Sequence, residues 1–273
     1  MVILMKNNYL LEFICGFSLL VFLSANVNAK AEPLRVSIPK MPVHAESHHK
    51  GVLVDFVKVL AKKLKRDIDI QVVPFSRSIY YVSTSKVDFH LPFIKPNIEV
   101  LTDKAALEDK NTATDLDFKQ HLHDFIYSDE TIFHVNFVLY SHIDVPIDLN
   151  KIENYKIETD SAHLAFLKGV SLGSDCITCS LKKVQYKMTD GYIFADSSTD
   201  PLLQKNKTIL PSIKREFYQK FAVKILFPNT KKGLELNKKV SAVIAELRLS
   251  GELRQLLSVV DFTYDDWQLK QGH

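Results

Sequence analysis

The stretch from Gly51 to Phe93 restricts the possible folds of this chain more than any other part of it. Apolar residues at 53–64 recur with the i, i+3, i+4, i+7 spacing of one helical face, while lysines occupy the opposite face. This pattern predicts an amphipathic helix packed on a core. Apolar and polar residues then alternate over 68–72 until Pro74, which predicts a half-buried strand.

A second helix and a third strand complete the stretch. Ser76 is the expected N-cap of a short helix that carries Ile79 and Val82, and alternating apolar residues predict the next strand over 87–91. A further strand is expected upstream, over 34–38. Short right-handed crossovers turn this order of strands and helices into a largely parallel sheet, so we expect an α/β fold.

The composition of the 273-residue chain is that of an ordinary globular protein, with 46% hydrophobic and 25% charged residues. The formal net charge of +3 is small and is spread along the chain. A nucleic acid is therefore not expected as a partner, and neither is an acidic membrane surface. We expect a monomer without a cofactor.

The N-terminus has the pattern of a secretory signal peptide over 1–29. Lys6 precedes a largely apolar run over 9–23, and small residues lead to Ala29 at the expected cleavage position. The alternative is a membrane anchor, but the run is about 15 residues long and contains Glu12, whereas a spanning helix needs about 20. We therefore expect a periplasmic protein that loses Cys15 with its signal.

Two cysteines remain after cleavage, Cys176 and Cys179. In an oxidising compartment, two cysteines three positions apart predict a local disulfide. Redox catalysis is the alternative, because a helix N-terminus lowers a thiol pKa and a helix is expected from about Ser180. No strand of a thioredoxin-like unit precedes the pair, and two thiols are too few for a closed zinc site, so a structural disulfide is favoured.

The segment 39–50 contains three histidines and Glu46, in a loop that follows a strand. Such loops bind ligands in open α/β sheets, and imidazole with carboxylate suits zinc or copper. However, His48 and His49 are adjacent, so we favour a solvated loop with one ligand-facing histidine, His44, and expect no metal. The charge-rich segment 99–124 predicts solvated surface, and no chemistry is assigned to it.

Beyond this segment, strands are predicted over 125–128, 133–139 and 154–158. Asp160 or Ser161 then caps an expected helix that ends at Gly169, and its backbone N–H groups form an anion site if they face a cleft. Residues 169–173 match the G-x-S-x-G elbow of serine hydrolases. The elbow requires a strand before it, and a helix is expected there, so we interpret Gly169 as a helix stop.

A helix over 181–188 followed by the strand 190–196 repeats the order found at 79–91, which indicates a second lobe on the plan of the first. The C-terminal part predicts a strand over 222–227 and two amphipathic helices, over 236–247 and 253–260. No H-E-x-x-H, Walker loop or G-x-G-x-x-G motif is present, and the chain has only eight glycines.

The order and spacing of these strings resemble the periplasmic solute-binding proteins of type II fold, in the extracellular family 3 group that serves amino-acid transporters. The similarity covers about 33–260. It is carried by the export signal and by the strings G-V-L-V-D-F at 51–56, P-F-S-R at 74–77, K-V-D at 86–88, D-G-Y-I at 190–193 and S-G-E-L at 250–253.

The resemblance implies two α/β lobes, each a mostly parallel sheet flanked by helices, with a ligand between them and hinge closure over it. Lobe 1 is expected to comprise 30–130 and 221–262, lobe 2 to comprise 131–220, and 263–273 to form a tail. Crossover segments are expected near 128–131 and 216–220.

Two departures from the resembled family bear on the ligand. The arginine that grips an α-carboxylate after the first lobe's strand is missing, because Lys95 and Pro96 follow Phe93 and Ile94. The position of the amino-group aspartate is Ala195, with Asp196 one residue later. A standard α-amino acid is therefore not the expected ligand, although Lys95 and Asp196 are possible substitutes.

The candidate ligand-binding residues share a position at a strand end or helix start that faces the expected cleft. They are His44, Phe75, Arg77, His90, Phe93, Tyr127, Ser161 and Asp196. Other roles compete at four of them: a surface or interlobe ion pair for Arg77 and a core position for His90, Phe75 and Phe93.

Three functions are considered. The first is a receptor that delivers a small polar solute to an ABC-type membrane permease, and the second is a sensory binding protein that reports ligand occupancy to a membrane signalling partner. The third is a dehydratase-type enzyme with Glu46 or Asp196 as a general acid, which we disfavour because neither acid carries a motif. We expect a binding protein rather than an enzyme.

Overall fold

The computed structural model of the chain describes residues 32–95 and 124–261. The predicted signal peptide with Cys15, the acidic segment up to residue 123 and the tail 263–273 lie outside the described residues. None of the helices in the described ranges is long and apolar enough to cross a membrane.

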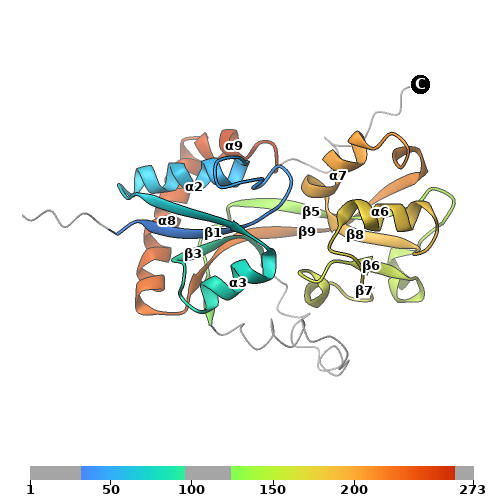
Figure 1. Cartoon of the computed structure of the whole chain (residues 1–273), viewed down its shortest axis with the longest axis horizontal. Helices are drawn as coiled ribbons and strands as arrows, with labels where there is room; N and C mark the ends of the chain where they lie inside the picture. Colours follow the sequence, from blue (N-terminus) through green and yellow to red (C-terminus); the bar gives the residue numbers. More distant parts are fainter. Residues whose placement is uncertain (1–31, 96–123, 262–273) are drawn as a thin grey trace, which may run out of the picture. The chain divides into compact units, whose positions relative to one another are not determined.

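The first part of the chain forms the predicted strand-helix-strand-helix-strand unit (Figure 1). Its elements are β1 (Leu34–Pro39), α2 (Val52–Lys63), β2 (Ile68–Val73), α3 (Phe75–Ser83) and β3 (Phe89–Ile94). Strand β1 pairs in parallel with both β2 and β3. The parallel sheet predicted from the periodicity of this stretch is therefore confirmed.

The start of α3 differs from the prediction. Pro74, not Ser76, is the N-cap, and Ser76 lies within the first turn of the helix. Proline has no N–H to continue the strand ladder, and its fixed φ leaves the backbone extended at −55° and 149°. The helix therefore begins directly after Pro74, without a side-chain cap.

The remaining strands belong to the same sheet. They are β4 (Phe125–Tyr127), β5 (Phe133–His142), β6 (Ile157–Thr159), β7 (Ser171–Leu172), β8 (Gly191–Ala195) and β9 (Ile213–Pro228). In the described residues the sheet has nine strands in the order β2-β1-β3-β9-β5-β8-β6-β7, with β4 also paired to β9. The pairs β8–β6 and β6–β7 are parallel, as are the pairs at the other end.

The long strand β9 joins the two parallel ends of the sheet. It pairs antiparallel with β3 through residues around Lys224 and with β5 along most of its length. Between the pairs Phe137–Gln219 and Val138–Phe217 the register shifts, so Tyr218 is an extra residue in a bulge. The bulge lies within the predicted crossover 216–220.

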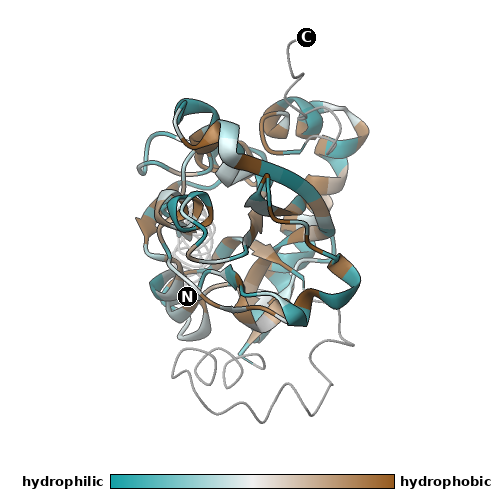
Figure 2. Cartoon of the chain, turned by 90° about the vertical axis from the view of Figure 1, so that its right-hand side faces the viewer, coloured by the Kyte–Doolittle hydropathy of each residue, from teal (hydrophilic) through white to brown (hydrophobic). Residues whose placement is uncertain are grey.

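Helices cover each end of the sheet. The helices α2, α8 (Lys231–Leu249) and α9 (Glu252–Leu257) contact one another beside β1, and α6 (Ile177–Gln185) and α7 (Asp196–Lys205) contact β5 and β8 (Figure 1). Figure 2 shows brown and teal residues in turn along the helices, as amphipathic packing requires. The α/β class, with parallel pairs at both ends of the sheet and flanking helices, agrees with the prediction. The described residues from Pro33 onward form one compact unit, so the predicted lobe boundaries stay a prediction.

The helix predicted from Asp160 to Gly169 is absent. A single 3-10 turn, η3 (Leu164–Phe166), occurs there, alongside η2 (Leu149–Asn154) and η4 (Leu210–Ser212) elsewhere. The Asp160 carboxylate accepts from the N–H of His163, and the N–H of Ser161 donates to Asp175. These contacts satisfy the backbone in a turn, and no helical anion site exists. Ser171 lies in β7 and donates its hydroxyl to the carbonyl of Ile157, which excludes the hydrolase elbow.

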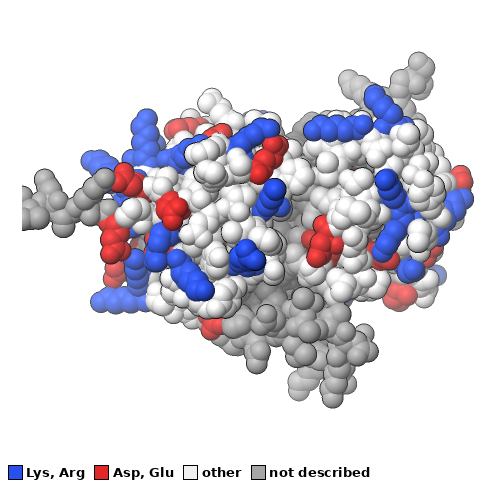
Figure 3. Space-filling view, in the orientation of Figure 1, with Lys and Arg blue, Asp and Glu red and all other residues white. Residues whose placement is uncertain are grey.

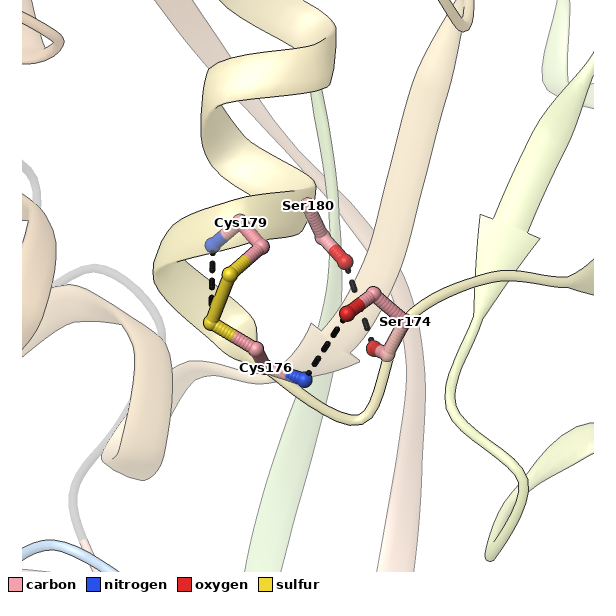
Figure 4. The surroundings of a disulfide bond; sticks show 4 residues. All are labelled: Ser174, Cys176, Cys179 and Ser180. Atoms are coloured by element: carbon pink, nitrogen blue, oxygen red, sulfur yellow. Dashed lines mark hydrogen bonds between the residues drawn. A yellow bond between two sulfur atoms is a disulfide. The ribbon is translucent and has the colours of Figure 1, made fainter.

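Cys176 and Cys179 form the predicted disulfide at the start of α6 (Figure 4). Cys176 is the N-cap, and its Sγ accepts from the N–H of Cys179 at 3.2 Å. The N–H of Cys176 donates to Ser174 Oγ, and Ser180 Oγ donates to the carbonyl of Ser174. The bridge therefore fixes the turn that precedes α6.

Reduction of this disulfide is expected to lower the free energy of unfolding by about 2 kcal/mol or less, because the bridge closes a very short loop. Urea unfolding with and without reductant measures the change. The variant Cys176→Ser/Cys179→Ser keeps a hydroxyl N-cap and should not respond to reductant. Free thiols in the protein as isolated would contradict the prediction.

Candidate ligand-binding site

A cavity of about 500 Å³, counting space that opens to solvent, lies against the central strands. Its walls are mostly aromatic and aliphatic, and no Lys, Arg, Asp or Glu of the described residues lines it. The lining residues are Met41, His44, Phe75, Pro92, Phe93, Ile94, Phe133, Val135, Phe137, His163, Phe166, Phe194, Ala195, Ser197, Ser198 and Val223. An apolar cavity with a few polar groups suits a small ligand.

The cavity is built from both ends of the sheet. Met41 and His44 come from the loop after β1, Phe75 from the start of α3, and 92–94 from β3. The opposite residues come from β5, from the loop after β6, and from the junction of β8 with α7. In the sequence, the helix and strand before this junction repeat the pattern of α3 and β3, and β3 supplies 92–94 on the other side.

His44 connects these two sides. Its Nδ1 lies 3.0 Å from the carbonyl oxygen of Pro42, and its Nε2 lies 3.5 Å from Ser197 Oγ. Burial lowers the pKa of His44, and the hydrogen bond to Pro42 only partly offsets this effect. The loop is held by Gly51, which has a φ of 143°, and a Cβ there would lie 2.3 Å from the carbonyl oxygen of His44. Only glycine fits this position.

Phenylalanine rings form the body of the site. The rings of Phe75 and Phe93 are stacked with centroids 6.1 Å apart. Phe93 also contacts Phe166 edge to face at 5.7 Å, and Phe75 lies 6.0 Å from the ring of His163. Aromatic contacts of this kind bury large apolar areas and fix ring orientation. The predicted residues Phe75 and Phe93 thus line the cavity.

His90 and Tyr127 lie behind this aromatic surface and do not line the cavity. His90 is 0% exposed, its Nδ1 lies 2.6 Å from Ser78 Oγ, and its ring packs against Phe75 and Phe93. Burial lowers the pKa of His90 to about 3. The ring of Tyr127 lies 6.0 Å from that of Phe93, and burial raises the pKa of its hydroxyl to about 12.

Four further polar or charged residues named in the sequence analysis, Arg77, Lys95, Ser161 and Asp196, are also outside the lining. Arg77 and Lys95 are exposed, and the hydroxyl of Ser161 donates to Asp175 at 2.8 Å. Asp196 is 1% exposed, and its carboxylate accepts from Asn136 Nδ2 and from the N–H of Ser197. Burial raises the pKa of Asp196, and these hydrogen bonds act in the opposite direction. Lys95 and Asp196, the possible substitutes for the missing ion-pairing groups, do not line the cavity.

Sequence reasoning missed His163 and much of the second side of the cavity. The Nδ1 of His163 lies 2.6 Å from Asp160 Oδ1, and the two residues are three positions apart after β6. This i, i+3 pair of an acid and a histidine was the available signal. Ser197 and Ser198 follow the predicted strand 190–196 directly, at the helix start that the plan of the first lobe points to.

On the face shown in Figure 3, Lys and Arg side chains of the described residues are spread out and do not gather in one patch. Within 32–95 and 124–261, no group of three or more His, Cys, Asp or Glu residues is placed to hold a metal ion.

No protein-family model matches the chain, and no curated protein matches it. Solved structures do match along most of its length. A histidine kinase sensor domain with similarity to periplasmic binding proteins has 12% identity and a TM-score of 0.63, and the match covers 88% of this chain and 97% of the sensor domain.

Two other matches are binding proteins. The substrate-binding protein of an amino acid ABC transporter has 18% identity and a TM-score of 0.57, with 86% of this chain and 98% of that protein covered. An ancestral amino acid-binding protein, described as a precursor of cyclohexadienyl dehydratase, has 13% identity and a TM-score of 0.61, with 85% and 97% covered. The chain therefore has the fold of the type II periplasmic binding proteins, as the sequence predicted.

Proposed function

We propose that this protein is a periplasmic solute-binding protein that encloses a small ligand in the cavity by hinge closure. The observation that carries the proposal is that both ends of the sheet line one cavity, with His44 and Phe75 on one side and His163 and Phe194 on the other. Relative movement of the two ends changes access to such a cavity, so affinity includes the equilibrium between open and closed forms.

Delivery of the ligand to an ABC-type permease is the role we favour. The predicted signal peptide supports export, and the substrate-binding protein of an amino acid ABC transporter shares the fold. A sensory role with a membrane signalling partner is the second candidate, because a histidine kinase sensor domain shares the fold as well. Permease and ATPase genes beside the gene for this chain would support transport, and a membrane kinase or cyclase gene would support signalling.

We propose binding rather than catalysis. The two candidate acids are poorly placed for turnover, since Glu46 is ion-paired with Lys50 on the surface and the buried Asp196 is hydrogen-bonded away from the cavity lining. A general acid has to reach its substrate. Turnover of a prephenate-like substrate that is lost in Glu46→Gln or Asp196→Asn would overturn this part of the proposal.

A thermal-shift screen of the mature protein against amino acids, polyamines, organic acids, peptides, metals and neutral single-ring compounds tests the proposal. A ligand at 100 times its Kd stabilises the folded state by about 2.7 kcal/mol, which raises Tm by about 5–10 °C for a chain of this size. We expect such a shift from at least one small organic compound.

Matched substitutions connect the shift to the cavity. Ala195→Leu adds three carbons to the cavity wall and should abolish the shift. Ala242→Leu makes the same change on the exposed face of α8 and should leave the shift intact. The proposal is wrong if no compound changes Tm, or if Ala195→Leu binds as tightly as the unchanged protein.

A further inference from the structure

The imidazole of His163, which is hydrogen-bonded to Asp160, is a polar group in the lining of the cavity. His163 lines the cavity, and its ring centroid lies 5.1 Å from those of Phe137 and Phe194 and 6.0 Å from that of Phe75. The imidazole is thus set among phenylalanine rings. A hydrogen bond between this imidazole and a ligand is poorly screened by water. The ring therefore contributes strongly to the selectivity of the cavity.

The carboxylate of Asp160 determines which nitrogen of His163 is available. Nδ1 lies 2.6 Å from Asp160 Oδ1, and a carboxylate can only accept, so the proton of the neutral ring resides on Nδ1. Nε2 then carries the lone pair, and no described residue bonds to it. The ring therefore offers a ligand a hydrogen-bond acceptor.

The charges around the cavity disfavour a ligand that has to form an ion pair through its carboxylate. No Lys or Arg among the described residues lines the cavity. Asp160 supplies negative charge beside His163, and protonation of the ring would neutralise that charge without giving a net positive one. A ligand carboxylate would lose its hydration and find no compensating cation among the described residues, which is costly.

From these observations we infer that the ligand is a small molecule with an apolar body and no carboxylate, and that one O–H or N–H group of this molecule donates to Nε2 of His163. This inference rests on the proposed binding function and narrows it to a ligand class. Asp160 is a positioning residue, because it fixes the tautomer of His163 and does not line the cavity itself.

Three single-ring probes test the inference on the mature protein: benzyl alcohol, phenethylamine and phenylacetate. Benzyl alcohol or phenethylamine should raise Tm at millimolar concentration, and phenylacetate should not. His163→Phe removes the acceptor and should weaken the binding of the donor-bearing probe about tenfold. His142→Phe is the matched control, because His142 pairs with Asp144 outside the cavity, and it should bind as the unchanged protein does.

Nitrogen NMR of the His163 ring separates a positioning role for Asp160 from a general structural one. Benzyl alcohol should move the Nε2 resonance, and Asp160→Ala, which removes the acceptor, should change the balance of the two tautomers even where Tm is kept. An unchanged tautomer in Asp160→Ala would remove Asp160 from the proposal.

The outcomes distinguish an incorrect ligand class from an incorrect binding function. If phenylacetate raises Tm as much as the donor-bearing probes, or if His163→Phe keeps full affinity, the ligand class is wrong while solute binding stands. If no donor-bearing probe binds but a carboxylate of the wider screen does, the ligand class also fails. If nothing in the wider screen binds, the proposed function fails with it.

Discussion

Replacing Arg215 with methionine is expected to lower the free energy of unfolding by about 3–5 kcal/mol. Arg215 on β9 and Asp200 on α7 form an ion pair with side chains that are 8% and 0% exposed. Arg215 Nε donates to Asp200 Oδ1 at 2.8 Å, Nη2 donates to Oδ2, and the hydroxyl of Tyr140 donates to Oδ1 at 2.8 Å. The substitution leaves a buried carboxylate without its counter-charge.

The loss in free energy of unfolding that Arg215→Met shows relative to the unchanged protein should be smaller at pH 5 than at pH 8. Burial already raises the pKa of Asp200 to about 7, although Arg215 and Tyr140 act to lower it, and loss of Arg215 removes the main opposing charge. The folded state then binds a proton that the unfolded state, with a carboxyl pKa of about 3.9, does not bind in this range. The free energy of unfolding of Arg215→Met therefore rises as the pH falls through the raised pKa of Asp200. Urea unfolding at the two pH values measures the difference.

Two controls show whether charge burial is the cause. The triple variant Asp200→Leu/Arg215→Met/Tyr140→Phe removes every polar member of the network and should recover most of the lost stability. Lys214→Met breaks the half-exposed pair with Glu216 and should change stability by about 0.5 kcal/mol or less. A triple variant as unstable as Arg215→Met would show that the network contributes by packing rather than by charge.

His90 is expected to make the fold sensitive to acid. Its folded-state pKa of about 3 lies below the ordinary value of 6.5, and burial is the main cause, with the backbone of Pro92 acting in the opposite direction. Between these two pH values the unfolded state binds a proton that the folded state excludes. The contribution of neutral His90 to the free energy of unfolding is therefore complete above pH 6.5 and is lost as the pH falls. The expected loss is about 2 kcal/mol from pH 7 to pH 5 and about 4–5 kcal/mol over the whole range.

The variant His90→Asn keeps a polar group near Ser78 Oγ and cannot titrate in this range. Its free energy of unfolding should be lower at neutral pH, because the smaller side chain leaves space, but it should fall less steeply below pH 6.5. His49→Asn, at an exposed loop histidine, should keep the steep profile. Equal slopes for the unchanged protein and His90→Asn would refute the assignment.

The spacing of apolar residues predicted the regular elements, because each of these helices and strands buries one face and that burial produces the spacing. The apolar stripe of 53–64 is α2, and the alternation at 34–38 and 68–72 is a parallel pair. The failure at 160–169 has a tertiary cause, since Asp160 and Ser161 carry cap signals but bond to His163 and to Asp175, fourteen residues after Ser161. Local propensity does not contain such a contact.

Part of the candidate site was predicted from the positions of its residues relative to strands and helices. His44, Phe75 and Phe93 follow strand ends or helix starts and line the cavity, as the rule for parallel sheets implies. Arg77 is only two residues beyond Phe75, but the helical turn places it on the exposed face. His163 was missed because its role depends on a carboxylate and on rings from three other elements.

Strand β9 makes the two ends of the sheet one cooperative unit. Its residues near Lys224 pair with β3, and those from Ile213 onward pair with β5, so neither end keeps a complete set of backbone partners when the other unfolds. The bulge at Tyr218 is the point on this strand where the ladder is interrupted. In the proposed hinge closure, the two ends would move by a twist of β9 and of the predicted crossover at 128–131, and the hydrogen bonds on either side of the bulge limit the twist of β9.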